Sequence, residues 1–245
     1  MTTYRWNTNE AAATFDAAAP AIHPFYVAVQ DEILSLLGAG GREPTCVVDL
    51  GGGSGRLLER VLERFPNSRA ILVDQSAAFL AVAERRLARF ADRTTLIEKR
   101  LQDDWATELP TTPGALVSMS AIHHLEPAEK RDLYARCFRS LATGGLLLNG
   151  DELRPESDAE YLAAMEWWCE QKKLAMAAGR IPESFRPMSE AWHDRNVRRF
   201  GEPKHSGDDC HETADVQCDY LRNVGFREVR VAWCEKLWGI LVAHK

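Results

Sequence analysis

Residues 47–62 read VVDLGGGSGRLLERVL, and this stretch decides the fold. An apolar run that ends at Leu50 predicts a buried strand, and four glycines fall within the next five positions. Leucines and valines at helical spacing follow, so the stretch predicts strand, tight turn and helix. Glycines lack the Cβ atoms that would keep a ligand off the backbone, and the N–H groups that open the helix face the same space. The turn is predicted to hold an anionic group, either a pyrophosphate or the carboxylate of an amino-acid-like cofactor.

A carboxylate is expected beside this turn. Residues 70–73 predict a second buried strand, which ends in Asp74. In a βαβ unit an acid at this position accepts hydrogen bonds from ribose hydroxyls. Asp74 could instead cap the helix predicted at residues 77–90. The ribose role is favoured, because the turn and the acid occur together at βαβ spacing.

The glycine spacing separates two classes of cofactor. A nicotinamide-binding turn expects G-x-G-x-x-G, whereas Gly51, Gly53 and Gly55 form G-x-G-x-G after Asp49. The heptad DLGGGSG resembles the first motif of class I S-adenosylmethionine-dependent methyltransferases, and the resemblance covers about residues 47–148 and returns near the C-terminus. It implies a Rossmann-like α/β fold with a seven-stranded sheet whose last strand is antiparallel. It also implies S-adenosyl-L-methionine as the cofactor, held by the turn and, through its ribose, by Asp74.

The resemblance implies further cofactor contacts along the same sheet edge. Many relatives carry an acid that binds the adenine amine after the third strand, but Arg100 stands at that position here. Leu101 keeps the apolar residue that follows, and Asp103 is the alternative acid if the register is shifted by a turn. Phe15-Asp16 resembles an aromatic-Asp pair that lies near the cofactor in similar methyltransferases. The cofactor residues implied in total are Asp49, Gly51, Gly53, Gly55, Asp74, Gln75, Leu101, Gln102, Ser118 and Phe15.

Composition narrows the class of protein. The chain of 245 residues suffices for one domain, and 30 Lys and Arg against 36 Asp and Glu give a net charge of −6. This balance argues against general nucleic-acid binding. We find no run of 18 apolar residues and no secretory signal pattern, so the sequence predicts a soluble, cytoplasmic protein without a membrane partner. The six cysteines are scattered and are predicted to be reduced.

The rest of the chain is predicted to decorate this core. Residues 1–40 are predicted to form an N-terminal helical cap that Pro20 and Pro24 interrupt. Residues 45–152 are predicted to form the cofactor-binding core. Residues 153–207 break the sheet pattern and predict an inserted helical lid. Residues 208–245 predict a last helix and hairpin, with Thr213 and Gln217 as the capping box of that helix.

Two neighbouring histidines are the predicted catalytic residues. The fourth strand, residues 115–120, leads into AIHHL, and its carboxyl end should face the same crevice as the glycine turn. His123 or His124 is then a candidate base or substrate orienter. The alternative is that one caps the helix beginning at Pro127 while the other packs against it. Asp151 and Glu152 follow the strand at residues 146–149 and are predicted as solvated loop acids, with substrate or cation binding as the alternative.

The lid is predicted to form the acceptor pocket. Tyr161, Met165, Trp168 and Cys169 share one helical face, and residues 188–200 predict a second helix. An aromatic and arginine lining suits a planar or anionic acceptor, although such residues more often provide packing and a solvated helix face. The predicted substrate residues are Trp168, Trp192, Arg199 and, between the last strands, Trp233.

A second group of residues could in principle coordinate zinc. His205, Cys210, His211 and Cys218 match the spacing of no closed zinc module, so no metal is predicted. The function predicted is in-line transfer of a methyl group to a small-molecule acceptor, most simply at oxygen, by a monomer or homodimer. Three alternatives stay open: an S-adenosylmethionine-modifying enzyme of the carboxy-S-adenosylmethionine synthase type, an RNA methyltransferase, and a non-catalytic cofactor-binding module.

Overall fold

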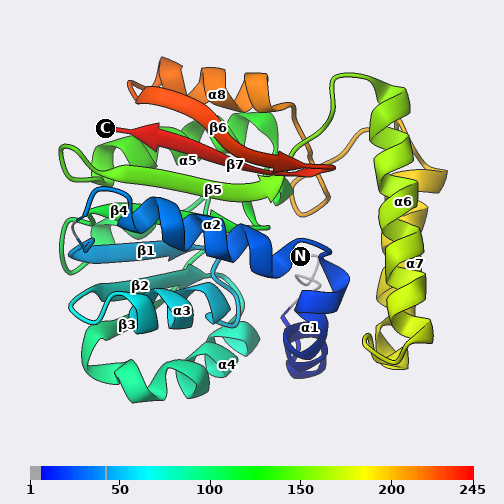
Figure 1. The fold of residues 1–245 in the computed structure, drawn as a ribbon, viewed down its shortest axis with the longest axis horizontal. Coiled ribbons are helices and arrows are strands. Elements are labelled where there is room, and N and C mark those ends of the chain that lie inside the picture. Colours follow the sequence, from blue (N-terminus) through cyan, green and yellow to red (C-terminus); the bar gives the residue numbers. More distant parts are fainter. Residues whose placement is uncertain (1–6, 42) are drawn as a thin grey trace.

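One seven-stranded sheet runs through the molecule in the order β3-β2-β1-β4-β5-β7-β6, as Figure 1 shows. The computed structural model describes residues 7–41 and 43–245. Strands β1 to β5 are parallel, and β7 pairs antiparallel with both β5 and β6. This is the predicted fold class. The strands are β1 (Cys46–Leu50), β2 (Arg69–Asp74), β3 (Thr94–Glu98), β4 (Ala115–Met119), β5 (Leu146–Glu152), β6 (Arg227–Glu235) and β7 (Trp238–His244).

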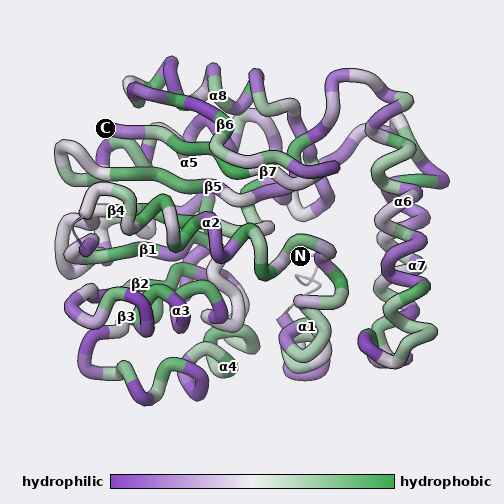
Figure 2. The backbone as a smooth tube through the Cα atoms, in the orientation of Figure 1, coloured by the Kyte–Doolittle hydropathy of each residue, from purple (hydrophilic) through white to green (hydrophobic). Residues whose placement is uncertain are grey.

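Helices cover both faces of the sheet. Alternate residues of β1 point to opposite faces: Val48 packs with α5 and α8, and Val47 packs with α2 and α3. Because both faces are covered, β1 is buried along its whole length. Figure 2 shows hydrophobic residues along β1 and β5, whereas the edge strand β6 is more hydrophilic. The helices are α2 (Tyr26–Gly38), α3 (Arg56–Arg64) and α4 (Ala77–Leu87) on one face, and α5 (Pro127–Ser140) and α8 (Ala214–Asn223) on the other.

Three further helices stand at the carboxyl edge of the parallel strands. These are α1 (Asn9–Ile22), α6 (Asp158–Ala177) and α7 (Arg186–His193), and in Figure 1 the pair α6 and α7 lies beyond the ends of the strands. The predicted face of α6 is buried, including Tyr161 and Trp168. No helix within the described ranges is long and apolar enough to cross a membrane.

The prediction that Pro20 interrupts the cap is wrong, because α1 continues through it to Ile22. A proline inside a helix leaves the carbonyl four residues earlier without its N–H donor. Here that carbonyl belongs to Asp16, and it accepts a hydrogen bond of 2.7 Å from Nη2 of Arg56. The guanidinium therefore satisfies the acceptor that Pro20 leaves, and the helix persists.

Two other local predictions are corrected by long-range pairing. Strand β5 extends to Glu152, because β7 pairs with it as far as Trp238, so Asp151 and Glu152 are buried strand residues instead of solvated loop acids. Helix α8 starts as predicted, with the Thr213 hydroxyl accepting the N–H of Val216. Gln217 lies one position too far along to complete a capping box, and its Oε1 accepts the hydroxyl of Tyr134 at 2.6 Å.

Candidate functional site

A cavity of about 850 Å³ opens at the carboxyl edge of the parallel strands. Its walls come from the glycine turn, α1, the loops after β2, β3 and β4, and the lid helices. Predicted cofactor residues and predicted acceptor residues thus face one continuous space. The predicted residues that line it are Phe15, Asp49, Gly51, Gly53, Asp74, Gln75, Leu101, Gln102, His123, His124, Trp168 and Trp192.

Four predicted residues lie outside the lining. Gly55 adopts φ +76° before α3, where a Cβ would approach Leu87 to 3.2 Å. Ser118 is buried, and its hydroxyl donates to the carbonyl of Leu50 at 2.8 Å. These two residues support the shape of the turn from behind. Trp233 packs against the ring of Phe25 at 5.7 Å between centroids.

Arg199 is the fourth, and its predicted place in the acceptor pocket is wrong. Its guanidinium is exposed and lies 3.0 Å from Asp194 and 3.7 Å from Glu202. Helix α7 ends at His193, and residues 194–198 form a π-helical turn that alters the helical spacing on which the prediction rested. Consequently Arg195 lines the cavity in its place.

The glycine turn holds the carboxylate of Asp74 at the cavity wall. Gly51 adopts φ +71°, and a Cβ there would lie 2.5 Å from the Cβ of Ala121, so no side chain fits. The N–H of Gly53 donates to Asp74 at 2.9 Å, and the N–H of Ser76 donates to its other oxygen at 2.8 Å. The alternative role of Asp74 as a helix cap is wrong, since the Ser76 side chain caps α4.

Asp49 is a buried carboxylate that faces the same space. It is 1 % exposed, and within the described chain neither of its carboxylate oxygens has a hydrogen-bond partner. Burial, and then the neighbouring charge of Asp74, raise the pKa of Asp49 to about 7. A buried acceptor without a donor is unfavourable, so a cationic ligand group in the cavity would stabilise this residue.

The two residues of the predicted Phe15-Asp16 pair make different contacts, Phe15 at the cavity and Asp16 with arginines near the glycine turn. Phe15 lines the cavity and meets the ring of Phe79 edge to face at 5.8 Å. Asp16 is absent from the lining and binds the guanidinium groups of Arg56 at 2.9 Å and Arg86 at 2.8 Å. Since Arg86 also donates to the carbonyl of Ser54, these ion pairs fasten α1 to the glycine turn.

The loop after β3 presents its predicted residues to the cavity. Arg100, Leu101 and Gln102 line it, and the amide of Gln102 also donates to the hydroxyl of Ser206 at 3.1 Å. Asp103 is absent from the lining, and its carboxylate instead accepts the N–H of Arg100 at 3.2 Å. The structure therefore favours the unshifted register, in which Arg100 stands where relatives carry the acid.

His123 is almost fully buried at 4 % exposure. Both its backbone N–H and its ring Nδ1 contact the carboxylate of Asp151, at 2.9 and 2.6 Å. Burial alone would lower the pKa of His123, but the carboxylates of Glu152 and Asp151 raise it to about 9. Neither histidine caps α5, because Glu126 and Glu129 form its capping box.

One contact of His124 fixes the tautomer of its neutral ring. Its Nδ1 lies 3.0 Å from the backbone carbonyl oxygen of Asp208. A carbonyl oxygen only accepts hydrogen bonds, so Nδ1 carries the proton and Nε2 is the basic nitrogen of the neutral ring. Of the two histidines, His124 is thus the one suited to accept a proton.

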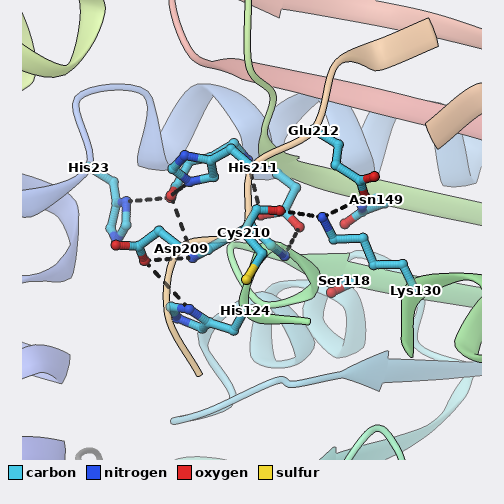
Figure 3. Close-up of polar contacts among 12 residues, drawn as sticks. His23, Ser118, His124, Lys130, Asn149, Asp209, Cys210, His211 and Glu212 are labelled. Carbon is cyan, nitrogen blue, oxygen red and sulfur yellow. Dashed lines mark hydrogen bonds and ion pairs between the residues drawn. The ribbon is translucent and has the colours of Figure 1, made fainter. Parts of the chain in front are cut away.

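The loop at residues 205–213 brings in residues that the sequence analysis did not assign. Its backbone pairs with the helical turn Ile122–His124, called the histidine turn below, because the N–H of Cys210 donates to the carbonyl of His123 at 2.8 Å. The buried ammonium of Lys130 binds the carbonyl of Cys210 and the carboxylate of Glu212, which fixes the loop (Figure 3). Residues 208–212 read DDCHE, and this concentration of acids with a histidine is the sequence feature that could have indicated a role for the loop.

The loop carries Asp209 and His211 to the histidine turn. Figure 3 shows Asp209 and His211 of this loop near His124, with His23 approaching from another segment. Nε2 of His211 lies 3.0 Å from Glu152, and Oδ1 of Asp209 lies 3.7 Å from Nε2 of His123. The four residues considered as zinc ligands do not meet, because the side chain of His205 is 78 % exposed and Cys218 lies on the buried face of α8, in the core.

Lys172 is a buried cation on the lid side of the cavity. It is 3 % exposed, and its ammonium lies 3.4 Å from the ring centroid of Trp192 and 4.7 Å from that of Trp168. Within the described chain it has no hydrogen bond or ion pair to an acid. Burial lowers the pKa of Lys172 to about 8. The charges of Asp209 and Glu152 act on this pKa in the opposite direction to burial. An ammonium that lines the cavity against aromatic faces is positioned to bind an anionic ligand.

These features define a class of protein. Residues 47–145 match the methyltransferase domain family. Together with the sheet order and the glycine turn, this match shows that the chain carries a methyltransferase domain and has the class I S-adenosylmethionine-dependent methyltransferase fold.

Each of the similar proteins aligns with only part of this chain. The chain is 32 % identical over 164 residues to malonyl-acyl-carrier protein O-methyltransferase of Geobacter sulfurreducens, covering 63 % of this chain and 55 % of that protein. It is 38 % identical over 163 residues to 23S rRNA (guanine(748)-N(1))-methyltransferase of Streptomyces fradiae, covering 65 % and 51 %. The chain thus spans about half the length of these relatives. An O-methyltransferase family protein from Burkholderia thailandensis shares the fold, with a TM-score of 0.64, 16 % identity, and coverage of 98 % of this chain and 63 % of that one.

The residues present fit S-adenosylmethionine, and Asp49 gives a test of that fit by pH. The cofactor carries an ammonium group that the carboxylate, but not the neutral acid, can pair with. Because the pKa of Asp49 is about 7, affinity for S-adenosylhomocysteine is expected to increase as the pH rises through that value. The ionised fraction of the Asp49 carboxylate predicts that this affinity rises about 8-fold between a pH of about 6 and a pH of about 7.5. Calorimetry would measure the change.

Asp49→Asn is the matched control for this pH dependence. It should bind the ligand with an affinity that stays flat over the same interval. The raised pKa also means that the ligand-free protein loses stability as the pH rises from about 4 to about 7. The variant lacks that penalty, so its Tm at a pH of about 8 should equal or exceed that of the parent. An unchanged pH dependence in the variant would assign the effect to another group.

Proposed function

We propose that the protein transfers the methyl group of S-adenosylmethionine to an oxygen atom of a small acceptor that carries a negative charge. The observation that supports this proposal is the buried ammonium of Lys172, which lines the same cavity as Asp49, Asp74 and the glycine turn. An acceptor hydroxyl or carboxylate that lies between Lys172 and the cofactor residues would be beside the histidine turn. The relative from Geobacter sulfurreducens, named as an O-methyltransferase, agrees with an oxygen acceptor.

The chain's own residues would bind, orient and shield the reactants. When bound, S-adenosylmethionine supplies a methyl carbon that is already electrophilic, so alignment of the acceptor is the main requirement. Asp74 would accept the ribose hydroxyls and Asp49 would pair with the ammonium group. Phe15 and the lid tryptophans would exclude water. Lys172 would hold the anionic end of the acceptor, and Nε2 of His124 would take the proton of a hydroxyl acceptor.

Lys172→Met tests the acceptor class. We expect kcat/KM for an anionic acceptor to fall about 10- to 100-fold, because one hydrogen bond to a charged group is lost. Formation of S-adenosylhomocysteine would be measured with a panel of small carboxylic acids, phenols, amines and an rRNA fragment. Cofactor affinity should stay unchanged, since Asp49 and Asp74 are untouched.

Lys173→Met is the control, because Lys173 is the next residue and its exposed ammonium lies 3.4 Å from Glu170. It should leave every rate unchanged. Turnover of the rRNA fragment alone would favour the activity in the name of the Streptomyces fradiae relative. Equal rates of Lys172→Met and the parent on every acid would contradict the anionic acceptor.

A further inference from the structure

We propose that His123, His211 and Glu152 bind a divalent transition-metal ion at the base of the cavity. The ligand atoms would be Nε2 of each histidine and Oε2 of the glutamate. The site goes beyond the proposed function, since metal binding is measurable without any methyl transfer. Its donor set of two imidazole nitrogens and one carboxylate suits Zn²⁺ or Fe²⁺.

The spacing of the three atoms matches one ion. Oε2 of Glu152 lies 3.5 Å from Nε2 of His123 and 3.0 Å from Nε2 of His211. One ligand atom from each of the three residues lies within 4.8 Å of those of the other two. Metal-ligand distances of about 2.0–2.2 Å place neighbouring ligand atoms about 3.0–3.5 Å apart in octahedral or tetrahedral geometry. Only a small adjustment of His123 would complete the set.

The other ring nitrogen of each histidine already has an outer partner. Nδ1 of His123 lies 2.6 Å from the carboxylate of Asp151, and Nδ1 of His211 lies 2.6 Å from the hydroxyl of Tyr161. A metal-binding histidine characteristically donates its remote N–H to such a group. The carboxylate of Asp151 only accepts, so Nδ1 of His123 carries a proton. The hydroxyl of Tyr161 can accept from Nδ1 of His211 when an ion replaces the proton that Nε2 of His211 shares with Glu152. Two histidines on separate segments thus direct Nε2 to the same carboxylate oxygen.

The polar groups around this point are incompletely paired. Oε1 of Glu152 and Nδ1 of His23 are both buried without a hydrogen-bond partner in the described chain, and they lie 3.6 Å apart. Asp151, Glu152 and Asp209 are each at most 4 % exposed, so three carboxylates occupy one buried cluster. Concentrated negative charge of this kind is stabilised by protons on the imidazoles or by a metal ion that displaces them.

The site would be reachable from the acceptor side. His123, Glu152 and Asp209 line the cavity, whereas His211 is buried outside the lining, next to Glu152. An ion held by three protein ligands keeps coordination positions for other groups. An acceptor oxygen could therefore complete the coordination shell, which would orient that oxygen and favour its ionised form.

Metal titration of chelator-treated protein tests the proposal. We expect the parent to bind one equivalent of Zn²⁺ and to give a visible absorption band with Co²⁺. His211→Ala and Glu152→Gln should abolish both signals. Tyr161→Phe should weaken Zn²⁺ binding about 10- to 100-fold, the usual effect of removing an outer partner.

His205→Ala is the matched control, because His205 lies on the same loop and its side chain is 78 % exposed. It should keep the full stoichiometry and affinity of the parent. Circular dichroism establishes folding, and if the two ligand variants do not fold, Tyr161→Phe and the Zn²⁺-induced rise in the Tm of the parent decide the question. Absence of a stoichiometric Zn²⁺ site in the parent, or equal losses in His205→Ala and His211→Ala, would overturn the proposal. S-adenosylhomocysteine binding, measured in parallel, separates this outcome from failure of the proposed function.

Discussion

Asp74→Asn is expected to weaken the binding of S-adenosylhomocysteine about 100-fold, because charged hydrogen bonds to two ribose hydroxyls are lost. The substitution is milder than alanine at this position. The carboxylate also accepts the N–H groups of Gly53 and Ser76, at 2.9 and 2.8 Å, so complete removal would disturb the turn itself. The asparagine oxygen can keep one of these bonds. Isothermal titration calorimetry would measure the change in Kd.

Glu98→Gln provides the comparison for this variant. Glu98 pairs with Asp74 in the register of β2 and β3, yet it is exposed and lies outside the cavity lining. Both substitutions remove one acid from the same edge of the sheet, but only the first should reduce affinity. Similar affinities for the two variants would remove the ribose assignment.

His124→Ala is expected to lower kcat for a hydroxyl acceptor about 100- to 10,000-fold, the usual contribution of a positioned general base. The reason lies in the tautomer: Nδ1 faces the carbonyl of Asp208 at 3.0 Å, so Nε2 is the proton acceptor. His123 is unsuited to this step, since Asp151 and Glu152 keep its imidazole protonated. Steady-state rates of S-adenosylhomocysteine formation would show the loss.

Two comparisons distinguish proton transfer from a structural effect. Added imidazole should restore part of the rate of His124→Ala, whereas a variant that is merely misfolded should not respond. A carboxylate acceptor needs no base, so its rate should fall much less than that of a hydroxyl acceptor. An unaltered kcat with a hydroxyl acceptor would exclude His124 as the base.

The cofactor end of the site could be predicted because its signals are local. The strand, turn and helix of residues 47–62 and the acid at the end of β2 are all encoded within short stretches. Parallel pairing of β1 with β2 then brings the acid to the turn without any further information. Gly51 and Asp74 consequently lie where the sequence predicts them.

The acceptor end depends on contacts between distant segments. Glu152 is a strand residue only because β7 pairs with β5, and His211 reaches it through a loop fixed by Lys130. Nothing in the sequence distinguishes Lys172 from other helix lysines, because its ammonium is covered by Trp192, which belongs to the separate helix α7. Arg199 was predicted from regular helical spacing, which the π-helical turn at residues 194–198 interrupts. Periodicity within one segment cannot reveal any of these arrangements.

The placement of one ammonium group against two neighbouring indoles also gives the protein an optical property. Trp168 and Trp192, two of its seven tryptophans, both lie within 5 Å of the Lys172 nitrogen, measured to the ring centroids. An anion that draws this nitrogen away from the rings changes the electric field across both chromophores. Occupancy of the acceptor end should thereby be coupled to intrinsic fluorescence, and filling could be followed in real time without a label.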